Sequence, residues 1–148
     1  VPLVAMLPVC LILALAIARP NPFSFGGALN AKFDPACPGI VRLHCHPLLL
    51  ALALWATAHA VPNGDLAHLI LFCTFAIFAI LGTRLVDRRR QREMGDTWQK
   101  LRSEVAARTP LWPPSLTGDD ALRLVAGLLL YATLIWLHPA LIGVSPLP

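Results

Sequence analysis

The chain has 148 residues, of which 57% are hydrophobic and 14% are charged, and its mean hydropathy is +0.67. This composition lies outside the range of water-soluble domains and predicts an integral membrane protein. The net charge of +4 does not indicate nucleic-acid binding, because most of the excess lies beside one apolar segment, where it has a topological role. Val1 opens an apolar run without a Met or a charged region, so we expect that the chain is truncated and that further helices precede it.

Four apolar stretches approach the length of a membrane-spanning helix. A bilayer core of about 30 Å needs roughly 20 apolar residues in a helix, and lipid cannot satisfy free backbone groups, so helices are the expected spans. The predicted fold is therefore an all-α, polytopic transmembrane helical bundle, with residues 1–148 forming one domain. The four spans are expected at about 1–18, 47–61, 66–83 and 124–144.

The second and third spans are predicted to form a helical hairpin. Pro47 suits the first position of a helix, because its missing N–H would have no partner there. The turn residues from Val61 to Asp65 separate the two helices, and Asp65 is suited to cap the next one. We expect this third helix to continue through Arg92.

Positive charge predicts the orientation of the chain. Residues 84–120 contain eight Arg or Lys, five of them between Arg84 and Arg92, whereas the turn at 61–65 contains none. By the positive-inside rule, residues 84–120 and the connection 19–46 are expected in the cytoplasm, and the turn and the C-terminus on the far side. The Arg run is expected to anchor the chain against anionic lipid.

The cytoplasmic segment 84–120 is predicted to contain a short amphipathic helix that lies on the membrane surface. Gly95 and Asp96 are typical of a helix break followed by a cap, and the segment 110–114 is expected to be a stiff connector. The apolar residues at helical spacing are Met94, Trp98, Leu101 and Val105.

The histidines are the candidate ligands. His46 and His59 would be about 20 Å apart in one helix, so they cannot share a metal ion. His59 and His138 are both expected at the outer side, and two imidazoles from membrane helices can hold a b-type haem. Trp55, one turn before His59, could stack on such a macrocycle. Each of these residues could instead be a polar or packing residue at a helix end.

Two other histidine patterns give weaker indications. His68 follows Asp65 in the first turn of its helix and is a second candidate beside His59, although a hydrated helix-end role is the commoner one. The sequence His44-Cys45-His46 combines nitrogen and sulfur ligands, but no further ligands follow at the usual zinc spacings. No phosphate loop, nucleophile elbow or paired-carboxylate motif is present, so hydrolase and kinase chemistry have no support.

Together these motifs resemble the NnrU family of bacterial membrane proteins. The resemblance covers nearly the whole chain and rests on an ordered set of motifs. It implies a multi-pass protein of the bacterial inner membrane, linked to denitrification and to nitric oxide, with nitric oxide or another small redox ligand and the lipid bilayer as partners. The motifs are His46-Pro47, Trp55-x-x-x-His59, Asn63-Gly64-Asp65, Asp87 with the following Arg run, Gly95-x-x-Trp98, and His138-Pro139 with the segment 143–147.

The NnrU family is similar to 15-cis-zeta-carotene isomerase, a membrane enzyme that uses haem b. This relationship implies that His59 matches a haem-ligating histidine, with His138 or a histidine upstream of this chain as the second ligand. The chain lacks the histidine that the family usually has in an N-terminal helix, and Ala56 stands where the isomerase pattern has a cysteine. An isomerase-like activity on a polyene is a further reading by analogy.

An alternative reading belongs to another class of enzyme. His46-Pro47 at a helix start, followed by a Gly-acidic-x-aromatic element at 95–98, resembles the isoprenylcysteine and phospholipid methyltransferases. There the motif helps to bind S-adenosylmethionine, which would make His46 a cofactor-binding residue. The chain departs from this motif at Cys45, Leu49 and Ala51, where the pattern has Arg, Tyr and Gly. A scaffold without a cofactor is a third reading.

Overall fold

We describe the fold from a computed structural model, which places residues 2–108 and 118–147. These residues contain helices and turns but no strand, which confirms the predicted all-α fold class. Two short 3-10 helices, Asn30–Lys32 and Gly39–Arg42, lie in the long connection that follows the first helix. The α-helices are α1 (Pro2–Ala16), α2 (Pro47–Ala60), α3 (Leu66–Met94), α4 (Asp96–Arg108) and α5 (Gly118–Ile142).

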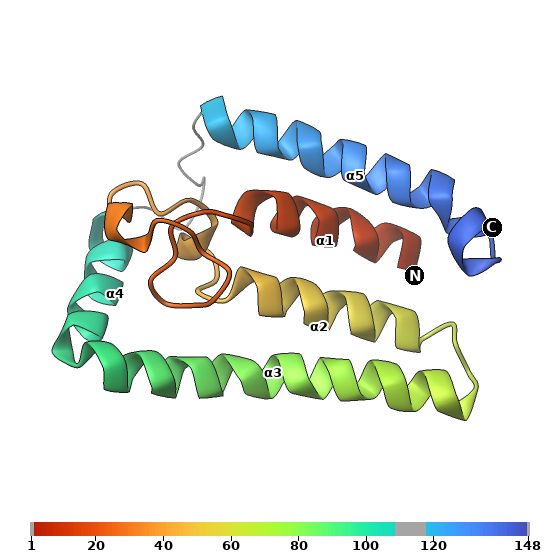
Figure 1. Cartoon of the computed structure of the whole chain (residues 1–148), viewed down its shortest axis with the longest axis horizontal. Coiled ribbons are helices and arrows are strands. Elements are labelled where there is room, and N and C mark those ends of the chain that lie inside the picture. Colours follow the sequence, from red (N-terminus) through yellow and green to blue (C-terminus); the bar gives the residue numbers. More distant parts are fainter. Residues whose placement is uncertain (1, 109–117, 148) are drawn as a thin grey trace.

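Four of the helices lie side by side in one layer, in the order α3, α2, α1, α5, and each runs antiparallel to its neighbour (Figure 1). The connection 17–46 and α4 cover one end of this layer, which we call the loop end. At the opposite end, which we call the turn end, lie the α2–α3 turn at 61–65 and the last turn of α5 (Figure 1). The Tyr131 hydroxyl donates to the Leu3 carbonyl at 2.8 Å and joins α5 to α1 near the turn end.

The α2–α3 hairpin has the predicted boundaries. His46 is the N-cap of α2 and Pro47 its first residue, and the side chain of Asp65 accepts a hydrogen bond from the His68 amide at 3.1 Å. The third helix continues past Arg92 and ends at Met94, before Gly95 with φ +57°. Local turn and capping signals therefore fixed both ends of the hairpin.

Two described helices are long and apolar enough to cross a membrane, whereas the sequence predicted four spans. These are α3, with 29 residues, and α5, with 25. The other two are apolar but shorter, with 15 residues in α1 and 14 in α2. The first helix ends at Ala16 and the left-handed Ala18 (φ +58°) follows it, which shortens the expected segment 1–18. Asp119 and Asp120 in the first turn of α5 move its start ahead of the expected residue 124.

The apolar face of α4 packs on protein rather than on lipid, which corrects the prediction of a helix on the membrane surface. Trp98 and Val105 form a buried cluster with Phe23 and Val41 from the connection 17–46. The Phe23 ring meets the Trp98 ring edge to face, with 6.3 Å between centroids. The helical spacing identified the apolar face of α4 correctly, but the residues that pack on this face come from the connection 17–46, which is distant in the sequence. The predicted connector at 110–114 lies outside the described residues.

Candidate functional site

His59 lies in the last turn of α2, at the turn end. Its Nδ1 atom donates to the Trp55 carbonyl oxygen at 2.8 Å, because a carbonyl can only accept. The imidazole is half-buried, and its centroid lies 5.3 Å from the Trp55 ring and 5.5 Å from the Phe72 ring. The Nε2 atom has no hydrogen-bond partner among the described residues. The ring is thus held by one nitrogen and aromatic neighbours, with the other nitrogen available.

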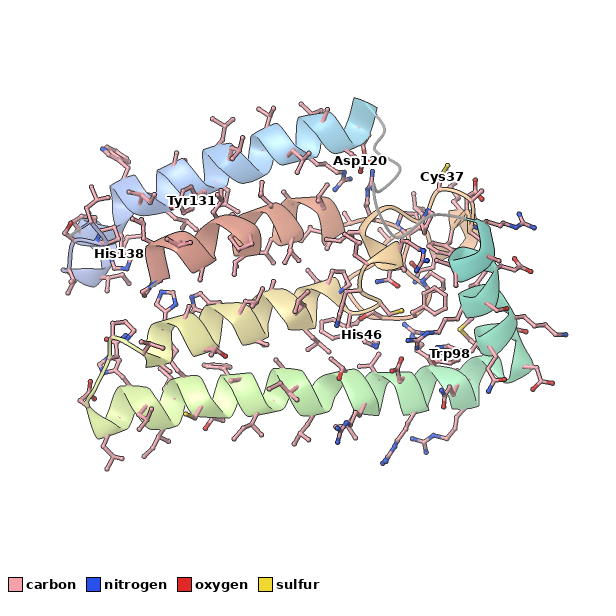
Figure 2. The ribbon with its side chains drawn as sticks, turned by 180° about the vertical axis from the view of Figure 1, so that it is seen from behind. Cys37, His46, Trp98, Asp120, Tyr131 and His138 are labelled. Atoms are coloured by element: carbon pink, nitrogen blue, oxygen red, sulfur yellow. The ribbon has the colours of Figure 1, made fainter. Side chains whose placement is uncertain are left out.

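His138 has the same hydrogen-bonding arrangement on α5. Its Nδ1 atom donates to the Val144 carbonyl at 2.6 Å, because the chain reverses at Gly143, where φ is +82°. Within residues 2–108 and 118–147, its Nε2 atom likewise has no partner. An imidazole whose Nδ1–H is bound to a carbonyl presents the Nε2 lone pair, which is the usual state of a metal-ligating histidine. Figure 2 shows His138 at the end of the layer opposite to His46.

The structure brings together some of the predicted turn-end residues and separates others. Trp55 lies against His59 and also packs on Phe72 and Phe75 of α3, so it fixes the position of the imidazole from within the hairpin. His138 is on the same end as predicted, but α1 lies between its helix and α2 (Figure 1). No group of three or more His, Cys, Asp or Glu that could hold a metal ion occurs in the described part of the chain.

His68, the second candidate beside His59, is engaged locally. Its Nδ1 atom lies 2.5 Å from Asp65 Oδ2, and both side chains are more than half exposed. Hydrogen bonds from the His68 amide and ring lower the pKa of the Asp65 carboxyl. This pair caps the start of α3, which is the helix-end role that the sequence favoured.

His46 lies at the loop end and bridges two polar side chains from distant parts of the sequence. The imidazole is 3% exposed. Its Nε2 atom donates to Asp87 Oδ1 of α3 at 3.0 Å, and its Nδ1 atom lies 3.0 Å from the Ser24 hydroxyl, which donates to it when the ring is neutral. Arg90 donates to the Ser24 carbonyl at 3.0 Å and ties the same loop to α3. Neither ring nitrogen of His46 is left to bind a cofactor.

The Ser24–His46–Asp87 chain has the connectivity of a hydrolase triad but not its accessibility. Ser24 is 1% exposed, so its hydroxyl is inside the protein and cannot meet a substrate. The arrangement holds the connection 17–46 against α3. Sequence reasoning missed Ser24 altogether, and the one local signal for Asp87 was an acidic residue inside the run from Arg84 to Arg92.

A pocket of about 400 Å³ opens beside this chain, between α3, α4 and the residues that precede α2. His44 and Cys45 line it, and burial lowers the pKa of the His44 imidazole and raises that of the Cys45 thiol. Arg102 of α4 lies over the Trp98 ring, with its guanidinium carbon 4.9 Å from the ring centroid. The pocket therefore combines the guanidinium groups of Arg42 and Arg102, the Asp87 carboxylate and the His44 imidazole.

Comparison with known proteins identifies the family. The family model described as NnrU protein matches residues 1–146, nearly the whole chain. The chain belongs to the NnrU family. No curated protein and no solved structure matches it. The resemblance inferred from the ordered motifs is thereby confirmed.

The motifs that suggested the NnrU family form two groups, one at each end of the layer. His46 with Asp87 and Trp98 belongs to the buried contacts of the loop end. His59 and His138 belong to the turn end, where each presents an Nε2 atom without a partner among the described residues. The first group joins chain segments, and the second is suited to bind a ligand.

Proposed function

We propose that this NnrU-family protein is a multi-pass protein of the bacterial inner membrane that holds a b-type haem at the turn end and takes part in the response to nitric oxide. The observation that carries the proposal is the shared state of His59 and His138. Each ring is oriented by an Nδ1–H bond to a carbonyl, and each leaves Nε2 for a metal. A b-type haem would be held by two such imidazoles, so the donor set fits the group.

Exposed apolar side chains support the membrane setting. In the most apolar windows of α3 and α5, mean hydropathy is 2.3 and 1.8, yet only 11% and 6% of the residues are buried. A core helix of a soluble protein would be buried at these positions, whereas lipid stabilises them without a protein cover. We propose that α1 and α2 cross with them as the inner helices of the layer, and that the Arg-rich loop end faces the cytoplasm.

Thiol labelling tests this orientation. Cys37 is exposed at the loop end, and Cys73 is exposed on the apolar part of α3. A membrane-impermeant maleimide is expected to label Cys37 in inverted vesicles and not in right-side-out ones. Cys73 is expected to remain unlabelled in both, because lipid covers it. Labelling of Cys73 by the impermeant reagent would contradict the proposed span.

In the proposed site, the protein supplies ligation, orientation and exclusion of water. His59 and His138 would hold the haem iron, and Trp55 and Phe72 pack against the His59 ring. Haem iron binds nitric oxide and changes oxidation state, which provides the chemistry of a sensor or a redox step. The bond from His59 Nδ1 to Trp55 fixes the tautomer and raises the basicity of Nε2.

An absorption spectrum tests the proposal directly. The protein is expressed with haem supplied, purified in detergent and compared with variants. We expect a Soret band that His59→Ala abolishes and that His68→Ala leaves unchanged, since the His68 side chain is 54% exposed whereas the His59 ring is half-buried against Trp55 and Phe72. His138→Ala is expected to shift the band, and nitric oxide is expected to shift the band of the reduced wild-type protein. Absence of a Soret band after loading with haem overturns the proposal.

The methyltransferase alternative would operate at the other end of the molecule. It requires His46 to contact S-adenosylmethionine, but both nitrogens of that ring are bound to Ser24 and Asp87. Saturable binding of S-adenosylmethionine that is lost in His46→Ala or Trp98→Ala would favour this alternative over the haem proposal. A polyene isomerase activity depends on the haem site and would be abolished with the Soret band.

A further inference from the structure

The pocket at the loop end has the features of a binding site that the haem proposal does not use. Its volume of about 400 Å³ falls within the range of small-ligand sites, about 300–1,000 Å³. Its wall is formed by Thr83 and Asp87 of α3, by Arg102 of α4, and by His44 from the connection that precedes α2. Three separate segments therefore converge on it: α3 contributes the Asp87 carboxylate, α4 the Arg102 guanidinium, and the connection Arg42, which donates to the Ala106 carbonyl at 3.5 Å.

Arg102 supplies the cation. Its Nη1 atom lies 3.9 Å from Asp87 Oδ1, which is too far for a hydrogen bond. The guanidinium is held over the Trp98 ring, and no acceptor within the described residues takes one of its N–H groups. A guanidinium with free donors, fixed by an aromatic ring, is suited to a phosphate group, which accepts two parallel hydrogen bonds.

Asp87 supplies the anion beside it. Oδ1 is occupied by His46, whereas Oδ2 has no donor among the described residues, and the side chain is 31% exposed. A ligand with negative charge alone would place that charge beside this carboxylate and be repelled by it. A ligand that pairs a phosphate with a nearby ammonium group satisfies both side chains. The pocket therefore selects a zwitterion.

The position of the pocket on α3 indicates where such a ligand comes from. Thr83 and Asp87 lie where the apolar part of the helix gives way to the Arg run from Arg84 to Arg92. Ile80 is one turn earlier on the same helical face and is 56% exposed, which continues the pocket into an apolar surface. A polar site that opens onto an apolar helix face at a membrane boundary matches a lipid headgroup followed by its acyl chains.

We propose that this pocket binds a zwitterionic phospholipid of the ethanolamine type, with its phosphate on Arg102, its ammonium group on Asp87, and an acyl chain along α3 past Ile80. His46 is the positioning residue, because it holds Asp87 from the buried side. The ammonium group donates N–H bonds to the free carboxylate oxygen, which a trimethylammonium group cannot do. This proposal rests on the proposed placement of α3 in the membrane and is independent of the haem site at the turn end.

Native mass spectrometry of the full chain tests the proposal. The protein is delipidated in detergent and mixed with dioleoyl phosphatidylethanolamine, phosphatidylcholine or phosphatidylglycerol in separate samples. Of the three headgroups, only ethanolamine donates N–H bonds to Asp87 while its phosphate lies on Arg102, so we expect phosphatidylethanolamine to be retained about tenfold more than either of the others. Arg102→Gln is expected to lower the retention of all three lipids, because each of them carries the phosphate group that Arg102 binds. Arg88→Gln, which changes an exposed arginine outside the pocket, is expected to leave the retention of each lipid as in the wild type.

Further variants make the outcome decisive. Asp87→Asn is expected to equalise the retention of the ethanolamine and choline lipids, because it removes the charge that binds the ammonium group. The loss of retention in Arg102→Gln is a second test, and this variant leaves the contact between His46 and Asp87 intact. Equal retention of all three lipids by the wild type overturns the proposal. So does displacement of the lipid by water-soluble glycerophosphoethanolamine at equal concentration, which would identify a soluble ligand. Since Arg102 is remote from the turn end, an unchanged Soret band in Arg102→Gln separates this result from failure of the haem proposal.

Discussion

Arg19 and Asp120 form a buried ion pair that joins the end of α1 to the start of α5, with Arg19 Nη2 2.5 Å from Asp120 Oδ1. The two side chains are 17% and 2% exposed. Close by, Arg123 donates to the carbonyls of Ala14 and Ile17 and so satisfies backbone acceptors at the end of α1. Charged side chains thus hold together the loop-end termini of two otherwise apolar helices.

Asp120→Asn is expected to lower the free energy of unfolding by about 3 kcal/mol, because Arg19 loses its buried partner and keeps, among the described residues, only the exposed Asp119. Asp119→Asn is the matched control. Asp119 also contacts Arg19, but its side chain is 57% exposed, so water replaces the lost contact and stability should hardly change. Unfolding in mixed detergent micelles, followed by circular dichroism, compares the variants. Equal losses would contradict the burial argument.

His46→Ala is expected to destabilise the protein by about 2 kcal/mol or more, since it leaves the Ser24 hydroxyl and one Asp87 oxygen without their partner. His138→Ala should have a small effect on the apoprotein, because among the described residues its ring bonds only to the Val144 carbonyl. The same unfolding assay without haem measures both. Wild-type stability in His46→Ala would show that the bridge is not needed to fix the loop.

Stability should fall as the pH is lowered from 7.5 to 5.5. Burial lowers the pKa of His44, helped by the neighbouring His46 and by Arg102 and opposed by Asp87. The unfolded chain therefore binds a proton at His44 more readily than the folded chain, so the contribution is full above the unfolded pKa and is lost below it. The midpoint of thermal unfolding at each pH measures the effect. His44→Gln should flatten the profile, and an unchanged profile in that variant would exclude His44 as its source.

Gly127→Ala is expected to be more damaging than Gly82→Ala. A Cβ atom at Gly127 would lie 3.1 to 3.2 Å from Leu11, from the Ala14 Cβ and from the Cys10 carbonyl, where the backbone of α1 cannot retreat. At Gly82 the new atom meets only the Leu49 side chain at 3.3 Å, which can rotate. We predict a loss of about 1–2 kcal/mol for Gly127→Ala and almost none for Gly82→Ala. The unfolding free energies of the two variants decide the matter, and the reverse order would refute the close α1–α5 contact.

Trp98→Phe should be tolerated far better than Trp98→Ala. The indole Nε1–H is buried without an acceptor among the described residues, so Phe removes an unsatisfied donor while keeping a ring against Phe23. Truncation to Ala opens a cavity in the cluster that holds α4 and should lower stability by about 3–5 kcal/mol. An equal loss of stability in Trp98→Phe and Trp98→Ala would contradict this prediction, because it would mean that the indole N–H has an acceptor.

Local signals in the sequence predicted the helices, the hairpin and the family. Turn chemistry at 61–65, the cap at Asp65 and the proline at 47 act over a few residues, so the sequence reveals them directly. The spacing of Trp98 and Val105 likewise identified the apolar face of α4. What covers that face could not be predicted, because its neighbours Phe23 and Val41 come from a loop far away in the sequence.

The sequence by itself determined which segments are apolar helices, where the hairpin turns and at which end each histidine lies, because those properties depend on near neighbours and on the alternation of helix direction. Only the tertiary structure decided that His46 is bound on both nitrogens by Ser24 and Asp87, whereas His59 and His138 each keep one nitrogen without a partner in the described chain. The order of helices in the layer brings distant side chains within hydrogen-bond reach, and no local pattern specifies that order. The pocket beside Asp87 and Arg102 is likewise a product of the tertiary structure, because its lining comes from segments that are distant in the sequence.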